Sequence, residues 1–159
     1  MPRITLAAVL VSLSAAAGAA DTPGTDPNIP RATNVVADRM AAARKAIAAS
    51  DFNGALRELQ VVVREEPRNA DAHNLMGLSY RKRANPDVTK AFEHYYIALR
   101  LDPRHKGAHE YIGQAYLMEK RPLQAEQHLA ELEKICGSQA CEEYQELSRA
   151  ITAFRKTAN

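Results

Sequence analysis

Two nine-residue segments decide the fold: Ala72-His73-Asn74-Leu75-Met76-Gly77-Leu78-Ser79-Tyr80 and, 36 residues later, Ala108-His109-Glu110-Tyr111-Ile112-Gly113-Gln114-Ala115-Tyr116. When the two are aligned, Ala, His, Gly and Tyr coincide, and an apolar Met76 lies opposite Ile112. Self-similarity at this period is typical of an array of helical hairpins. A single hairpin cannot bury its apolar face alone, so neighbouring hairpins must stack against each other.

Helical periodicity extends outward from both segments. The spacing of apolar residues predicts seven helices, at about 34–49, 52–66, 70–83, 88–100, 106–119, 122–135 and 139–156. We expect the sixth helix to bury Leu123, Ala125, Leu129 and Leu132. The seventh has one apolar face and one charged face, as a helix that caps the end of an array requires.

These hairpins resemble the tetratricopeptide repeat, a 34-residue helix–turn–helix unit. The positions that carry the resemblance are Gly77, Tyr80, Ala91, Tyr95 and Pro103 in one unit, and Gly113, Tyr116, Ala125 and Leu129 in the next. The first unit is less typical, because Ala43 and Ala46 replace the usual glycine and tyrosine. The resemblance implies an all-α, right-handed α-α superhelix over residues 34–156. It would contain three hairpins (36–69, 70–105 and 106–138) and a capping helix (139–156).

The N-terminus has a different composition. Arg3 precedes an apolar run from Ile4 to Ala17, and Ala17-Gly18-Ala19 supplies small residues for cleavage. Residues 1–20 therefore have the pattern of a secretory signal peptide, and we expect a periplasmic or secreted protein. The alternative is an uncleaved anchor, for which the run is short; after cleavage we expect no stable membrane insertion. Residues 21–33 contain three prolines and a glycine, which predicts a disordered linker.

The resemblance also indicates where a partner would bind. In this family the first helices of the hairpins line a concave groove. The equivalent residues here are Met40, Arg44, Asn74, Leu78, Arg81, Glu110, Tyr111 and Gln114. This mixed surface suits a protein or peptide partner with some acidic character, although these residues could also be ordinary solvated helix faces.

One specialised form of the groove is absent. Repeats that bind the acidic tails of cytosolic chaperones carry a clamp of Lys, Arg and Asn. The equivalent positions in this chain are Met40, Arg44, Leu75, Gly107 and Tyr111, so only Arg44 supplies a cation.

The chain has two cysteines, Cys136 and Cys141. In an exported protein this pair predicts a disulfide across the turn at Gly137-Ser138. The alternative is a thiol-redox factor. The four-residue spacer differs from the two-residue spacer of thioredoxin-like motifs, which favours a structural bond.

Other functions find little support. The formal net charge of +2 gives no reason to expect nucleic-acid binding. His73 and His109 share one repeat position and His94 and His128 another, so packing explains them better than metal binding does. No catalytic or cofactor motif is present. We therefore predict a non-catalytic protein-interaction scaffold in the cell envelope, without metal or cofactor. The alternatives are the redox factor or a protein that binds a small ligand in the groove.

Overall fold

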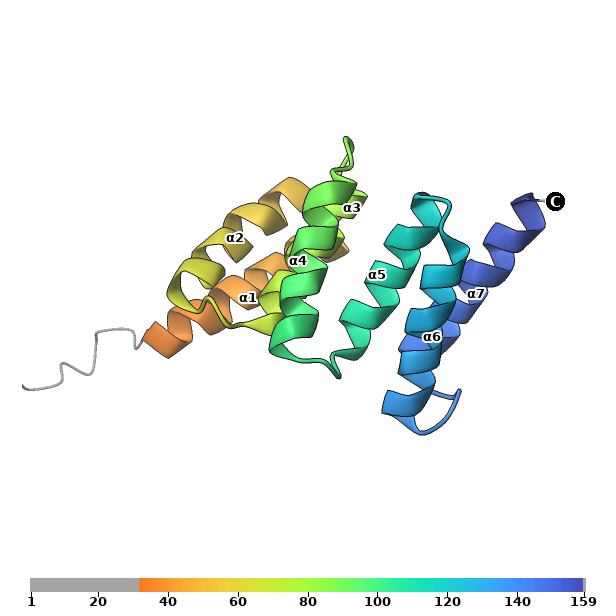
Figure 1. Ribbon diagram of the computed structural model, residues 1–159. Coiled ribbons are helices and arrows are strands. Elements are labelled where there is room, and N and C mark those ends of the chain that lie inside the picture. The colour runs from red at the N-terminus through yellow and green to blue at the C-terminus, as the bar shows by residue number, and fades with distance from the viewer. Residues whose placement is uncertain (1–31, 159) are drawn as a thin grey trace, which may run out of the picture.

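The computed structural model describes residues 32–158, which fold as seven α-helices without a strand in that range (Figure 1). The helices are α1 (Ala32–Ala48), α2 (Phe52–Glu65), α3 (Ala70–Lys82), α4 (Val88–Leu101), α5 (Lys106–Met118), α6 (Pro122–Cys136) and α7 (Glu142–Ala158). The predicted signal peptide, 1–20, and the predicted linker up to residue 31 lie outside the described residues.

The helices are arranged as a stack of hairpins. α1 packs on α2, α3 on α4 and α5 on α6, while α2 packs on α3 and α4 on α5 to join successive hairpins. α7 follows as an unpaired helix that packs on both α5 and α6 at the C-terminal end (Figure 1). The predicted all-α superhelix of three hairpins with a C-terminal helix is confirmed.

Local chemistry explains where the helices begin. Asp51, Asn69 and Asp87 each precede a helix, and each side chain accepts a hydrogen bond from the backbone N–H three residues later. This bond satisfies one of the free N–H groups of the first turn. Pro122 opens α6, where its missing N–H costs nothing. Gly137 ends α6 with a φ of 65°, a left-handed conformation that glycine adopts without strain.

Glycines at equivalent positions of the second and third hairpins lie at close contacts between core helices. A Cβ atom added to Gly77 would lie 2.5 Å from the ring of Tyr95, so the absence of a side chain lets α3 and α4 approach closely. The equivalent Gly113 faces Leu147 of α7, which would lie 2.6 Å from an added Cβ. Leu147 and Ile151 are buried in the same cluster as the hairpin residues. The last helix therefore completes the core of the third hairpin.

The structure corrects several details. Leu123, predicted to be buried by α6, is 70% exposed. α1 begins at Ala32, inside the segment predicted to be linker. α7 begins at Glu142 rather than at residue 139, because residues 137–141 form turns between the two helices. Over residues 32–158, no helix combines the length and the apolar character needed to cross a membrane.

Candidate functional site

The predicted groove residues lie on three helices that are neighbours in space. α1 contacts α3, α3 contacts α5, and α5 contacts α7, so these four helices form one continuous side of the molecule. We call this side the inner face. It is defined by the eight predicted residues, Met40, Arg44, Asn74, Leu78, Arg81, Glu110, Tyr111 and Gln114, together with Glu142, Glu143 and Glu146 of α7. Met40 and Leu78 are buried in the folded chain. They leave a partner little apolar area, which differs from the expectation.

Charged side chains link α1, α3 and α5 at one end of the inner face. Arg44 Nη2 lies 3.4 Å from Asp71 Oδ2, and His105 Nε2 donates to the other carboxylate oxygen over 3.0 Å. His105 Nδ1 accepts from the N–H of Ala108 and so caps α5. Arg44 and Asp71 remain about half exposed, and such surface pairs contribute little stability. They are therefore free to exchange partners with a ligand.

Two buried polar side chains occupy the centre of the inner face. Asn74 is 5% exposed and Arg81 is 7% exposed. Arg81 Nε donates to the phenol oxygen of Tyr95 over 3.3 Å, and its guanidinium lies 5.8 Å from the ring centre of Tyr111. Among the described residues, neither Asn74 Oδ1 nor Arg81 Nη2 has a hydrogen-bond partner. The centre therefore contains one unused acceptor and one unused donor, both covered by neighbouring side chains, so a partner reaches them only when those side chains move.

The α7 end of the inner face is acidic. Glu110 is 8% exposed, and Gln114 Nε2 donates to its carboxylate over 2.8 Å. Burial, followed by the charges of Glu146 and Glu143 on α7, raises the pKa of Glu110 to about 7. Because these carboxylates gather here, this end opposes an acidic ligand. The expected preference for an acidic peptide therefore does not extend to the α7 end.

Sequence reasoning missed a pair of histidine contacts away from the inner face. His73 Nδ1 lies 3.0 Å from His94 Nδ1, and His109 Nδ1 lies 2.9 Å from His128 Nδ1. The other ring nitrogens, on His73 and His109, each lie within 3.1 Å of the carbonyl of the proline that precedes their hairpin. The recurrence in register was visible in the sequence, but only the packing of each hairpin shows that the two positions meet.

The cysteines lie where predicted. The sulfurs of Cys136 and Cys141 are at bonding distance, with Cα atoms 6.2 Å apart, and they connect the end of α6 to the start of α7. Glu143 completes the one group within residues 32–158 that has metal-ligand spacing. Its two sulfurs are bonded to each other, so they do not offer the thiolates that a metal ion requires.

Comparison with known proteins supports the fold. No family model matches the chain, and no curated protein matches it. One similar solved structure is the TPR2B domain of yeast Sti1 in its complex with pHsp70. It has a TM-score of 0.68 and 13% identity, and the match covers 78% of this chain and 98% of that one. At this identity the likeness establishes a tetratricopeptide-like helical fold and nothing about the ligand.

Proposed function

We propose that the protein is a non-catalytic scaffold whose inner face binds an extended segment of a protein partner. The observation that carries this proposal is the unused hydrogen-bonding capacity of Asn74 Oδ1 and Arg81 Nη2. Buried polar groups without partners are rare, and each costs about 1–3 kcal/mol. A polypeptide main chain supplies both missing groups, an N–H for Asn74 and a carbonyl for Arg81, once it displaces the side chains that cover these two atoms.

The charges on the inner face indicate what kind of segment fits. Arg44 lies at the α1 end and can meet an acidic side chain. Glu110 and the α7 carboxylates lie at the other end, where a neutral or basic side chain is favoured. We therefore propose a partner segment whose charge changes along its length, rather than a uniformly acidic one.

The solved relative supports an interaction role. Its title describes a repeat domain in a complex with pHsp70, which is a protein–protein assembly. Stacked repeats create extended surfaces that bind partners, and this is the reason for proposing a scaffold rather than an enzyme.

We also propose that the protein works in the periplasm or outside the cell. The N-terminal Arg3 and the apolar run from Ile4 to Ala17 support export. The Cys136–Cys141 bond is consistent with an oxidising compartment, where disulfides persist.

Affinity capture from an envelope extract tests the inner face. The full chain serves as bait beside the double variant Arg44→Ala/Gln114→Ala, with retained proteins identified by mass spectrometry. The matched control is Arg57→Ala/Gln60→Ala on α2, because Arg57 is also exposed and also lies near an aspartate, Asp51. We expect a partner that the parent and the control retain and the inner-face variant loses. Equal retention by all three would contradict the proposal.

A further inference from the structure

A second site lies outside the inner face, at the junction of the second and third hairpins. A cavity of about 320 Å³ opens there between α4, the end of α5 and the turn before α6. Its lining residues are Thr89, Phe92, Glu93, Tyr96, Tyr116 and Arg121. None of them belongs to the inner face, and nothing in the proposed function uses them.

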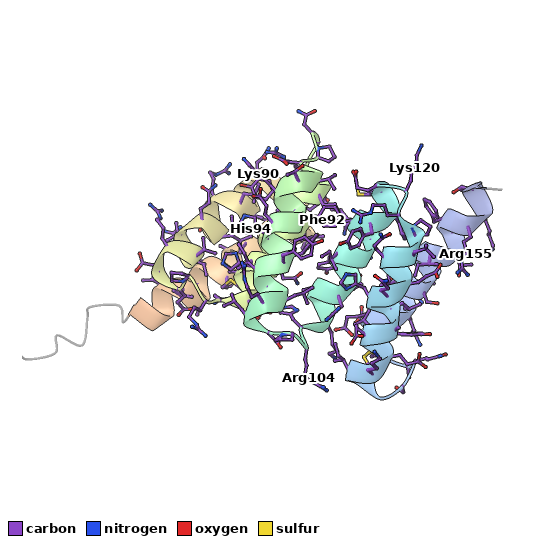
Figure 2. All side chains as sticks on the ribbon, in the orientation of Figure 1. Lys90, Phe92, His94, Arg104, Lys120 and Arg155 are labelled. Carbon is purple, nitrogen blue, oxygen red and sulfur yellow. A yellow bond between two sulfur atoms is a disulfide. The ribbon has the colours of Figure 1, made fainter. Side chains whose placement is uncertain are left out.

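Aromatic rings form the walls of this cavity, which we call the aromatic pocket. Phe92 projects from α4 toward α5 (Figure 2), and its ring centre lies 4.7 Å from that of Tyr116. The phenol groups of Tyr96 and Tyr116 are hydrogen-bonded to each other, which fixes both rings. The guanidinium of Arg121 lies 4.8 Å from the ring centre of Tyr116. The pocket is therefore preorganised, which reduces the entropy lost when a ligand binds.

The repeat itself does not require these aromatic residues. Tyr116 corresponds to Tyr80, which lies 36 residues earlier in the second hairpin. The N-cap residues Asp51 and Asp87 show that α2 and α4 are also offset by 36 residues. At that offset, Phe92 corresponds to Leu56 and Tyr96 to Gln60. The equivalent positions on α6, 34 residues beyond α4, are Glu126 and Ala130. Phe92 packs against the core, as Leu56 does one hairpin earlier, but two of three hairpins fold without an aromatic ring at either position, so the fold does not require one.

The rim of the pocket carries one charge of each sign. Glu93 and Arg121 are both exposed, and within the described range neither makes an ion pair. Tyr96 is 48% exposed, an unusual exposure for a large ring. An open pocket of this kind cannot enclose a small ligand on all sides. It suits a side chain whose own backbone covers the opening.

We propose that the aromatic pocket is a second protein-docking site, which takes one aromatic side chain flanked by a basic and an acidic residue. The inserted ring packs against Phe92 and Tyr96 and under the guanidinium of Arg121. The flanking base faces Glu93, and the flanking acid faces Arg121. Tyrosine and arginine are the residue types that dominate the energetics of such contacts. The chain would then hold two segments at once, one on the inner face and one in this pocket.

The absence of tryptophan from the chain gives a direct test. The probe is a blocked five-residue peptide, Gly-Lys-Trp-Glu-Gly, whose fluorescence anisotropy is followed while the full chain is added. The test variant is Phe92→Leu/Tyr96→Gln, which installs the residues that α2 carries at this register and which the fold already accepts. We expect saturable binding by the parent and about tenfold weaker binding by the variant, because two aromatic contacts are lost.

Three controls separate this site from the alternatives. The inner-face variant Arg44→Ala/Gln114→Ala should bind the probe as the parent does. The exposed-site variant Arg121→Gln should weaken binding with only a small decrease in the unfolding temperature, because the lost contact with Tyr116 is at the surface. The same peptide with Leu in place of Trp should fail to displace the probe. The proposal is overturned if the parent does not bind, if Phe92→Leu/Tyr96→Gln binds equally well, or if the inner-face variant loses binding.

Sedimentation of the parent and of Phe92→Leu/Tyr96→Gln tests a second copy of the chain as the occupant. We expect the same sedimentation for both proteins. Self-association of the parent that disappears in the double variant would assign the pocket to a second copy and overturn the proposal. Neither experiment depends on the inner face, so this proposal and the proposed function can fail separately.

Discussion

The Nδ1 atoms of His73 and His94 lie 3.0 Å apart, close enough for one proton between them and too close for two. His73 Nε2 must carry a proton, because it donates to the carbonyl of Pro67. In the neutral ring, His73 Nδ1 is therefore the acceptor and His94 Nδ1–H the donor. The next hairpin repeats this arrangement with His109, His128 and the carbonyl of Pro103. The second and third hairpins each contain such a histidine pair, and its hydrogen bond is lost when both rings are protonated.

The histidine pairs predict that acid destabilises the fold. Burial, and then the charge of the partner ring, lowers the pKa of His94 and of His128 to about 4. The unfolded chain binds protons near pH 6.5, so it holds more protons than the folded chain between these values. The contribution of both pairs is complete above pH 6.5 and is lost as the pH falls toward 4. Urea unfolding at pH 7.5, 6.0 and 5.0 measures this slope.

The matched variant for this measurement is His94→Gln/His128→Gln. An amide can still donate a hydrogen bond to His73 or His109, but it does not titrate in this range. We expect the variant to lose much less stability than the parent between pH 7.5 and 5.0. Parallel curves for the two proteins would show that the histidine pairs are not responsible.

For Glu110 we predict a pH dependence of folding stability with the opposite sign. Burial and the α7 carboxylates raise its pKa to about 7, so its stabilising contribution is present at low pH and is lost as the pH rises through 7. The substitution Glu110→Gln keeps an acceptor for Gln114 and removes the charge. We expect this variant to be more stable than the parent at pH 8, with a difference that shrinks toward pH 5. A less stable variant at pH 8 would show that the charge is compensated in the folded chain.

Asn74 predicts a separation of stability from binding. Its buried Oδ1 has no partner within residues 32–158, so replacing the side chain by leucine removes an unsatisfied group of similar size. We expect Asn74→Leu to unfold at the same urea concentration as the parent or a higher one, because about 1–3 kcal/mol of desolvation cost disappears. The same variant should lose the partner retained in the capture experiment. A clear loss of stability would mean that Asn74 is a structural residue.

Removal of the disulfide should affect stability only near the C-terminal end of the fold. Its loop is short, so loop entropy assigns the Cys136–Cys141 bond about 2 kcal/mol. Cys136→Ser/Cys141→Ser should therefore leave the first two hairpins unchanged and increase amide hydrogen exchange in α7. Partner capture by the reduced form tests the redox alternative, because a structural bond leaves binding intact apart from contacts made by α7. Loss of partner capture by Cys136→Ser/Cys141→Ser, while α7 stays protected from exchange, would favour redox chemistry.

Much of the fold could be predicted from local signals. Gly77 and Gly113 mark close helix approaches, and the period that contains them sets the number of hairpins. The helix ends were predicted to within three residues, because prolines and capping aspartates mark them. Leu123 was assigned to the core because its spacing fits an apolar stripe, but it lies at the start of α6, where the helix has no neighbour to cover it. A periodic pattern shows which face could be buried and not how far the covering helix extends.

The candidate site was less predictable, because it depends on contacts between hairpins. The resemblance identified the positions of Asn74, Arg81 and Glu110, but their burial follows from the helix packed beside each of them. One end of the inner face is acidic because α7 places the charges of Glu143 and Glu146 close enough to act on Glu110, more than 30 residues away in sequence. The aromatic pocket likewise joins Phe92 to Arg121 across two turns. Such pairings become visible only when the hairpins are stacked.

Site-specific photo-crosslinking tests the central claim most directly. A photoreactive residue is placed at Gln114 on the inner face or at Gln60, which is exposed on α2 in the first hairpin, and each protein is irradiated in an envelope extract. We predict that the Gln114 protein crosslinks to one dominant partner, that the Gln60 protein does not, and that Asn74→Leu abolishes the crosslink. A partner captured from Gln60 but not from Gln114 would contradict binding at the inner face.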